Sequence, residues 1–236
     1  FYPILGERVW GWWGHAIDTL AVFATLFGLA TSLGFGTEQA LAGLNFLFGW
    51  SKGNGAKVLL ISVITGLALI SVLRGLDGGV KVLSEINIGL AALLLLFVIA
   101  VGPTATIFET ILSGGLAYAK ELIPLSMPFA REDENFSQGW TSFYWAWWIS
   151  WSPFVGMFIA RVSRGRTVRE FVFCVIIIPT LVSIVWMGAF GGTAIAEVIA
   201  NAAAPVKSAA LELKLFEMLK PLPIATVTSI LGIVLV

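Results

Sequence analysis

Five long apolar runs, separated by more polar connections of different lengths, constrain this chain more than any other feature. Because an α-helix needs about 20 apolar residues to cross the hydrocarbon core of a bilayer, each run is close to the length of a membrane span. Backbone groups find no water to bond inside hydrocarbon, so each run is predicted to be helical. The runs cover residues 16–36, 58–73, 86–102, 141–160 and 171–190, and a shorter one covers residues 222–236. The predicted fold class is therefore an all-α membrane protein.

Composition supports a membrane protein and excludes several other classes. Hydrophobic residues make up 58% of the chain and charged residues 12%, which leaves too little polar surface for a soluble globule. Fourteen basic residues balance fourteen acidic ones, so the chain lacks the excess positive charge that nucleic-acid binding requires. Cys174 and His15 are the only residues of their kinds. They predict neither an intrachain disulfide nor a metal site, and no cofactor is expected.

The ends and the connections suggest how the chain is organised. It begins at Phe1 rather than at a methionine, and its last apolar run is shorter than a span. We interpret residues 1–236 as a single transmembrane domain, incomplete at both ends. Residues 104–123 mix apolar with charged side chains before Pro124 and are predicted to form a helix on the outer membrane surface. Arginines are dense in the short connection 161–169, which the positive-inside rule places in the cytoplasm.

The fourth apolar run is unusually rich in aromatic residues. At about 100° per residue, six aromatic side chains share one face of the predicted helix, while Trp145 points to the opposite side. Tryptophan in membrane helices is usually found at the two interfaces, and the middle tryptophans of this run lie deeper than that. The six residues of the aromatic face are Tyr144, Trp147, Trp148, Trp151, Phe154 and Phe158.

Two interpretations of this aromatic face are open: it packs against other helices, or it lines a cavity. Large indole rings hinder the close approach that small residues give to helices in membranes, and each indole N–H needs a partner. Both points favour a cavity. The face of an aromatic ring attracts cations, and a quaternary ammonium group suits it because such a group is weakly hydrated and has no N–H to donate. The pattern therefore predicts a site for solutes of the choline and betaine kind.

Two further features of the spans allow alternatives. Pro153 lacks an N–H and frees the carbonyl one turn before it. This indicates either a discontinuous helix, of the kind that coordinates ions and substrates in transporters, or a tolerated proline kink. Asp18 lies about one turn into the first span, where it stabilises a helix N-terminus or takes part in gating or proton transfer.

Residues 140–171 resemble the signature of the betaine/choline/carnitine transporter family. The run reads WTSFYWAWWISWSPFVGMFIARVSRGRTVREF, and the resemblance extends to GHAID at 14–18, ATLFG at 24–28, GFGT at 34–37 and FGGT at 190–193. It implies a parent of about twelve helices with a LeuT-like core of two inverted repeats, usually assembled as a homotrimer. This chain would then be a partial LeuT-like transporter core that supplies about helices five to ten.

The resemblance also implies roles for individual residues. Substrate contacts would come from Trp147, Trp148 and Trp151, with Tyr144 on the same face and Ser32 near the polar end of the solute. Phe143 and Phe158 would form the outer and inner gates. One sodium site would use Thr25 and Phe154, but Leu29 stands where sodium-coupled relatives have a second threonine, and leucine offers no oxygen to a hard cation. The resemblance is compatible with symport of the solute with sodium, symport with protons, and exchange of one solute for another.

Other function classes fit the sequence less well. It contains no GxxxxGK[ST] loop for an ATP-driven pump, and a channel would call for a polar pore lining rather than an indole wall. An intramembrane enzyme would need a nucleophile–base pair, paired acids or a metal, which the sequence does not offer. We therefore predict a secondary transporter, not an enzyme, in the bacterial inner membrane. Glycine betaine, choline or carnitine would be carried by ion-coupled symport; the alternatives are an exchanger, or a carrier of dimethylsulfoniopropionate or ectoine-like osmolytes.

Overall fold

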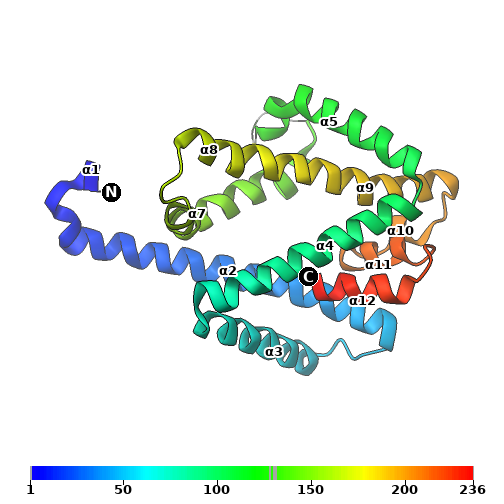
Figure 1. The fold of residues 1–236 in the computed structure, drawn as a ribbon, viewed down its shortest axis with the longest axis horizontal. Helices are drawn as coiled ribbons and strands as arrows, with labels where there is room; N and C mark the ends of the chain where they lie inside the picture. Colours follow the sequence, from blue (N-terminus) through cyan, green and yellow to red (C-terminus); the bar gives the residue numbers. More distant parts are fainter. Residues whose placement is uncertain (1, 128, 130–131, 236) are drawn as a thin grey trace. The chain divides into compact units, whose positions relative to one another are not determined.

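The computed structural model describes residues 2–127, 129 and 132–235 and is helical, with no β-strand in those ranges (Figure 1). This confirms the predicted all-α class. The long helices are α2 (Trp12–Phe48), α3 (Asn54–Leu73), α4 (Lys81–Val101), α5 (Thr104–Ser126), α7 (Phe143–Val162) and α9 (Ile178–Ala200). The short helices are α1 (Tyr2–Leu5), α6 (Glu134–Phe136), α8 (Val168–Val172), α10 (Pro205–Ser208), α11 (Lys214–Leu219) and α12 (Ala225–Leu235). Single turns of 3-10 helix lie at Gly6–Trp10 and Leu211–Leu213, and π-helical turns at Leu76–Val80, Ser137–Ser142 and Phe173–Ile177.

Four helical segments are long and apolar enough to cross a membrane. They cover Trp12–Phe48, Asn54–Leu73, Gly78–Val101 and Val168–Ala200, so the chain is a multi-pass membrane protein. The predicted span at 141–160 corresponds to α7, which has 20 residues but does not reach the same hydropathy. Its tryptophans, serines and proline are much less apolar than the leucine, isoleucine and valine that dominate the other spans. Its position in the membrane stays a prediction.

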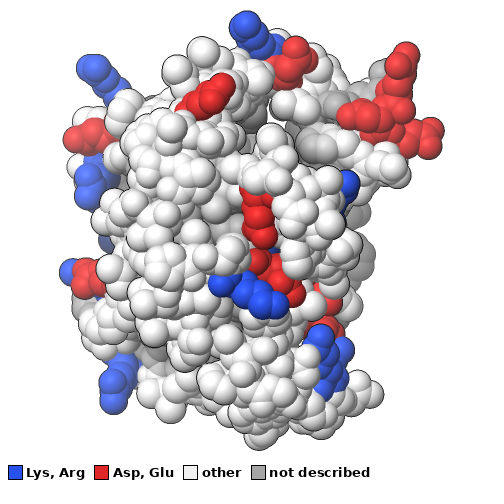
Figure 2. Space-filling model, turned by 90° about the vertical axis from the view of Figure 1, so that its right-hand side faces the viewer, with Lys and Arg blue, Asp and Glu red and all other residues white. Residues whose placement is uncertain are grey.

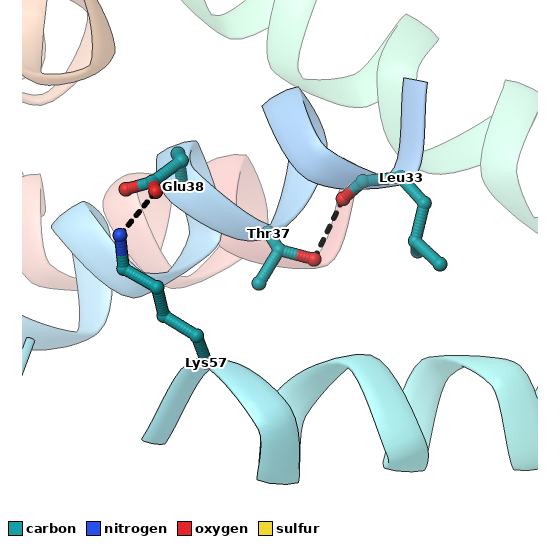
Figure 3. Close-up of polar contacts among 4 residues, drawn as sticks. All are labelled: Leu33, Thr37, Glu38 and Lys57. Atoms are coloured by element: carbon teal, nitrogen blue, oxygen red, sulfur yellow. Dashed lines mark hydrogen bonds and ion pairs between the residues drawn. The ribbon is translucent and has the colours of Figure 1, made fainter. Parts of the chain in front are cut away.

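Helix α2 is much longer than the predicted span at 16–36. It has 37 residues and continues through a polar stretch without interruption. Figure 3 shows how two of these polar side chains are accommodated: the hydroxyl of Thr37 donates to the carbonyl of Leu33 at 2.7 Å, and Glu38 forms an ion pair with Lys57 of α3. The helix therefore extends past the apolar run because its polar residues find partners within the protein.

The chain forms two compact units, which are described separately. One contains Phe1–Ser32 and Tyr118–Ile177, and the other Leu33–Ala117 and Ile178–Val236. The second unit holds the main hydrophobic core, where α4, α9, α11 and α12 pack together. Leu94, Val98, Ile107 and Leu219 are almost completely buried there. Helix α9 also approaches α5 closely, because Gly188 has no side chain to keep Ile111 away.

The first unit contains the arginine-rich connection between α7 and α8. Gly165 has a φ of +84°, a conformation that favours glycine in this tight turn. The next helix begins with a capping box: Thr167 accepts a hydrogen bond from the backbone N–H of Glu170, and the Glu170 carboxylate accepts one from the backbone N–H of Thr167 at 2.9 Å. These two signals fix where one helix ends and the next begins.

Charged side chains are sparse on the surface. On the face drawn in Figure 2, lysine, arginine, aspartate and glutamate form scattered groups separated by broad uncharged areas. Many large apolar side chains of the spans are exposed, among them Leu67 and Leu69 on α3 and Leu96 on α4. Such a surface is suited to lipid rather than to water.

Candidate functional site

An aromatic cluster occupies the first half of α7. The ring of Phe143 meets Trp147 edge-on at a centroid distance of 5.1 Å, and it meets Tyr144 in the same way at 5.6 Å. Tyr144 in turn contacts Trp148 at 5.8 Å. Residues three or four positions apart lie on the same side of a helix, so the Phe143–Trp147 and Tyr144–Trp148 contacts follow directly from the spacing in the sequence. The structure thus brings together four of the predicted site residues.

The rings at the end of this cluster are open rather than packed. Trp148 is 61% exposed and Tyr144 is 43% exposed within the described chain. An exposed indole face has a negative quadrupole and a large apolar surface, so it can hold a weakly hydrated cation by electrostatic attraction and dispersion. The aromatic cluster is therefore chemically able to bind a quaternary ammonium group.

Trp151 lies one turn further along α7 and faces α2. A Cβ atom built on Gly28 would lie only 2.4 Å from the indole nitrogen of Trp151, so this ring is in close contact with the glycine. The indole N–H is buried and has no hydrogen-bond partner in the described chain. Burying an unpaired donor is costly, so this N–H is the most demanding polar group of the contact between α7 and α2.

Gly28 is a residue that the sequence analysis placed in a motif without giving it a role. We expect Gly28→Ala to displace the Trp151 ring, because the added methyl group would overlap the indole. If Trp151 contacts the solute, the apparent affinity for glycine betaine should fall about five- to tenfold, similar to a damaged cation–π contact. Equilibrium binding to the purified complete transporter measures this. Gly34→Ala on the same helix is the matched control, since a Cβ there would meet no atom within 4 Å; equal affinities for both variants would contradict the prediction.

A pocket of about 370 Å³ lies between α2 and α7 and contains both residues of the predicted ion site. Thr25 and Phe154 line it together with Asp18, while the remaining walls are apolar. The Thr25 hydroxyl donates to the carbonyl of Ala21 at 2.8 Å, which leaves its oxygen lone pairs available as an acceptor. Asp18 adds a carboxylate that the sequence analysis did not connect with Thr25. The two residues are seven positions apart, a spacing that places them on one helix face.

Of the two alternatives at Pro153, the structure shows a tolerated proline rather than a discontinuous helix. Helix α7 continues from Phe143 to Val162 as an α-helix with the proline inside it. Pro153 cannot donate to the carbonyl of Ile149, but the hydroxyl of Ser152 donates to that carbonyl at 2.9 Å. This substitution of a side-chain donor for the missing N–H explains why the alternative, a tolerated proline, holds.

Two other predicted site residues lie apart from the aromatic cluster. Ser32 is half-buried on α2, one turn beyond Gly28, and Phe158 is exposed near the end of α7. In the part of the chain that the structure describes, no ring contact or hydrogen bond joins either residue to Trp147 or Trp148. Their roles near the solute and at the inner gate stay predictions.

Comparison with known proteins identifies the family. The sequence model of the betaine/carnitine/choline family of transporters matches residues 1–236, the whole chain. The chain belongs to this family. The match confirms the resemblance found in the sequence, and the family that it describes is one of transporters rather than enzymes.

Similar members of the family are named as transporters of glycine betaine, in one case also of proline and choline. A glycine betaine/proline/choline transporter of Vibrio parahaemolyticus is 63% identical over 236 residues, which cover 100% of this chain and 43% of that protein. A glycine betaine transporter of Bacillus subtilis is 44% identical over 237 residues, 99% of this chain and 46% of that protein. A glycine betaine transporter of Acinetobacter baylyi is 43% identical over 239 residues, 100% and 36% respectively. The chain thus spans less than half the length of these relatives.

Proposed function

We propose that this chain is part of a secondary transporter that carries glycine betaine or choline across the bacterial inner membrane. The observation that carries the proposal is the open aromatic cluster of α7, with Tyr144 and Trp148 exposed beside Trp147. The names of the relatives support the same solutes, since those proteins are described as transporters of glycine betaine, proline and choline.

The chemistry of these solutes matches the chemistry of the cluster. A trimethylammonium group spreads its charge over methyl groups and makes no N–H hydrogen bonds, so water holds it weakly and an indole face holds it well. Each such ring contributes about 1 to 2 kcal/mol when water is excluded. Trp151 would be the third contacting tryptophan, and its unpaired N–H offers a donor to a carboxylate or hydroxyl of the solute.

Ion-coupled symport by alternating access is the proposed mode of transport. In this proposal the coupling ion binds in the pocket that contains Thr25, Phe154 and Asp18, because that pocket combines a hydroxyl and a carboxylate oxygen between two helices. Sodium and a proton both fit these oxygens. In this proposal the complete protein has a LeuT-like core, assembles as a homotrimer and places α5 on its outer surface.

Solute exchange is the second candidate mode, and Leu29 favours it. A leucine occupies the position of the second threonine of the sodium site, so this chain supplies fewer oxygens to a cation than its sodium-coupled relatives would. An exchanger needs no coupling ion at that place. Dimethylsulfoniopropionate and ectoine-like osmolytes are the alternative solutes, because a sulfonium group suits the same rings.

Uptake into proteoliposomes tests the proposal. The complete transporter would be reconstituted, and entry of radiolabelled glycine betaine and choline would be measured under an imposed sodium gradient, an imposed proton gradient, and neither. Uptake driven by one gradient is the expected result and identifies the ion. Uptake that depends only on unlabelled solute inside the vesicles would replace symport by exchange. No uptake of either solute under any condition, with protein-free liposomes as the baseline, would overturn the substrate assignment.

A further inference from the structure

The end of α5 is an unusual helix terminus. The last carbonyls of any α-helix lack partners within the helix, and here the final turn also contains Pro124. The carbonyl of Leu122 receives the hydroxyl of Ser126 at 2.6 Å, and the carbonyl of Pro124 receives the N–H of Met127 at 3.2 Å. The carbonyls of Leu125 and Ser126 therefore need donors from elsewhere.

Both donors come from the beginning of the helix that carries the aromatic cluster. The hydroxyl of Thr141 donates to the carbonyl of Leu125 at 3.2 Å, and the indole N–H of Trp145 donates to the carbonyl of Ser126 at 3.0 Å. Thr141 is buried and lies in the π-helical turn that leads into α7, one turn before Trp145. Two donors on the helix with the aromatic cluster, four residues apart, thus form hydrogen bonds with two consecutive carbonyls of α5. All four residues belong to the first compact unit.

These bonds occupy a side of α7 that the aromatic cluster leaves free. Trp145 is about 100° around the helix from Tyr144 and, in the same direction, about 60° beyond Trp148, so its ring diverges from the Tyr144–Trp148 contact. It is also the one tryptophan of this run that the sequence analysis left outside the aromatic face. Its N–H is fully used by α5, which gives this residue a defined task other than binding solute.

We propose that Thr141 and Trp145 are positioning residues that fix the rotation and depth of α7, and with them the placement of Tyr144 and Trp148. This inference rests on the proposed function. A helix is stiff over one or two turns, so a two-point attachment beside the cluster sets the direction in which the neighbouring rings point. Loosening it would let α7 rotate or slide, and the rings would meet the solute less often in the binding arrangement.

Four single substitutions in the complete transporter test the inference. Thr141→Val and Trp145→Phe each remove one donor while keeping most of the side-chain volume. Thr141→Ser keeps the hydroxyl, and Ser126→Ala removes a side chain but leaves the accepting carbonyl in place. The dissociation constant of radiolabelled glycine betaine would be measured on purified, correctly folded protein, and amide hydrogen exchange would be followed in residues 120–127.

Thr141→Val and Trp145→Phe should each weaken the binding of glycine betaine about fivefold, the usual effect of one lost hydrogen bond. Each should also raise the rate of amide hydrogen exchange at the end of α5. For Thr141→Ser and Ser126→Ala, the dissociation constant of glycine betaine should stay within about twofold of the value for the unchanged protein. If Thr141→Val and Trp145→Phe reduce only the yield of folded protein and bind glycine betaine normally per folded molecule, the residues are merely structural and the inference is overturned. Failure of the unchanged protein to bind glycine betaine would instead overturn the proposed function and this inference with it.

Discussion

Replacing Trp148 by alanine should weaken the binding of glycine betaine to the complete transporter by about five- to thirty-fold. The indole is 61% exposed and lies at the end of the aromatic cluster, in contact with Tyr144, so its face is the most accessible cation-binding surface of α7. Losing one aromatic wall removes about 1 to 2 kcal/mol of cation–π and dispersion energy, which corresponds to that change in affinity. Isothermal titration or equilibrium binding of the labelled solute measures it.

Two matched variants show whether the effect belongs to the aromatic face. Trp148→Phe keeps a ring with a weaker quadrupole and should lose only part of the affinity. Ile149→Ala truncates the adjacent residue, which is 66% exposed and points about 100° further around the helix, and should bind normally. If Trp148→Ala and Ile149→Ala lose equal amounts of affinity, the tryptophan acts through general packing and the binding role assigned to it is wrong.

Helical periodicity was sufficient to predict the aromatic cluster. Contacts among rings three or four residues apart depend only on the local helix, so Tyr144, Trp147 and Trp148 meet as their spacing requires. The partners of the remaining tryptophans depend on tertiary structure. Helical spacing predicts neither the close contact of Trp151 with Gly28 nor the hydrogen bond from Trp145 to the carbonyl of Ser126, because each joins different segments of the chain.

The helix boundaries show the same division between local and tertiary causes. The predicted end of the second span at residue 73 coincides with the end of α3, where the apolar run stops at Arg74. The first span was predicted to end at residue 36, yet α2 continues to Phe48. Glu38 lowers the hydropathy of the sequence after residue 36, whereas the structure shows that it forms an ion pair with Lys57 of the next helix (Figure 3). A hydropathy average over neighbouring residues cannot include an ion pair between two different helices.

Pro153 illustrates a local effect that the sequence analysis left between two alternatives. The missing N–H was certain from the residue type, but its consequence depended on whether another donor could reach the freed carbonyl. Ser152 does so, and α7 stays helical. Serine directly before proline is therefore a usable signal: a hydroxyl next to the proline can replace the lost hydrogen bond and keep a membrane helix intact.

The largest loss of folded protein is expected for Gly188→Leu. A Cβ atom at this position would lie 2.3 Å from the side chain of Ile111 and 2.9 Å from its Cα atom, so α9 and α5 touch with almost no space between them. Backbone atoms cannot yield as a flexible side chain can. Even alanine would force the helices apart, and overpacking of this kind costs about 1 to 3 kcal/mol, with more for a bulkier residue. The aqueous hydrophobic effect does not hold helices together in lipid, so the lost contact area is not recovered elsewhere.

Size-exclusion chromatography of fluorescently tagged transporter in detergent, before and after heating, measures this effect. Gly188→Ala should lower the apparent melting temperature, and Gly188→Leu should leave little monodisperse protein. Gly191→Leu is the control on the same helix, because a Cβ there would meet no atom within 4 Å, and it should behave like the unchanged protein. The comparison between the variants at Gly188 and Gly191 isolates the effect of packing. Both glycines have the same low helix propensity, so only the proximity of Ile111 distinguishes the two positions. Equal tolerance of leucine at both positions would show that α5 and α9 are not in close contact at Gly188.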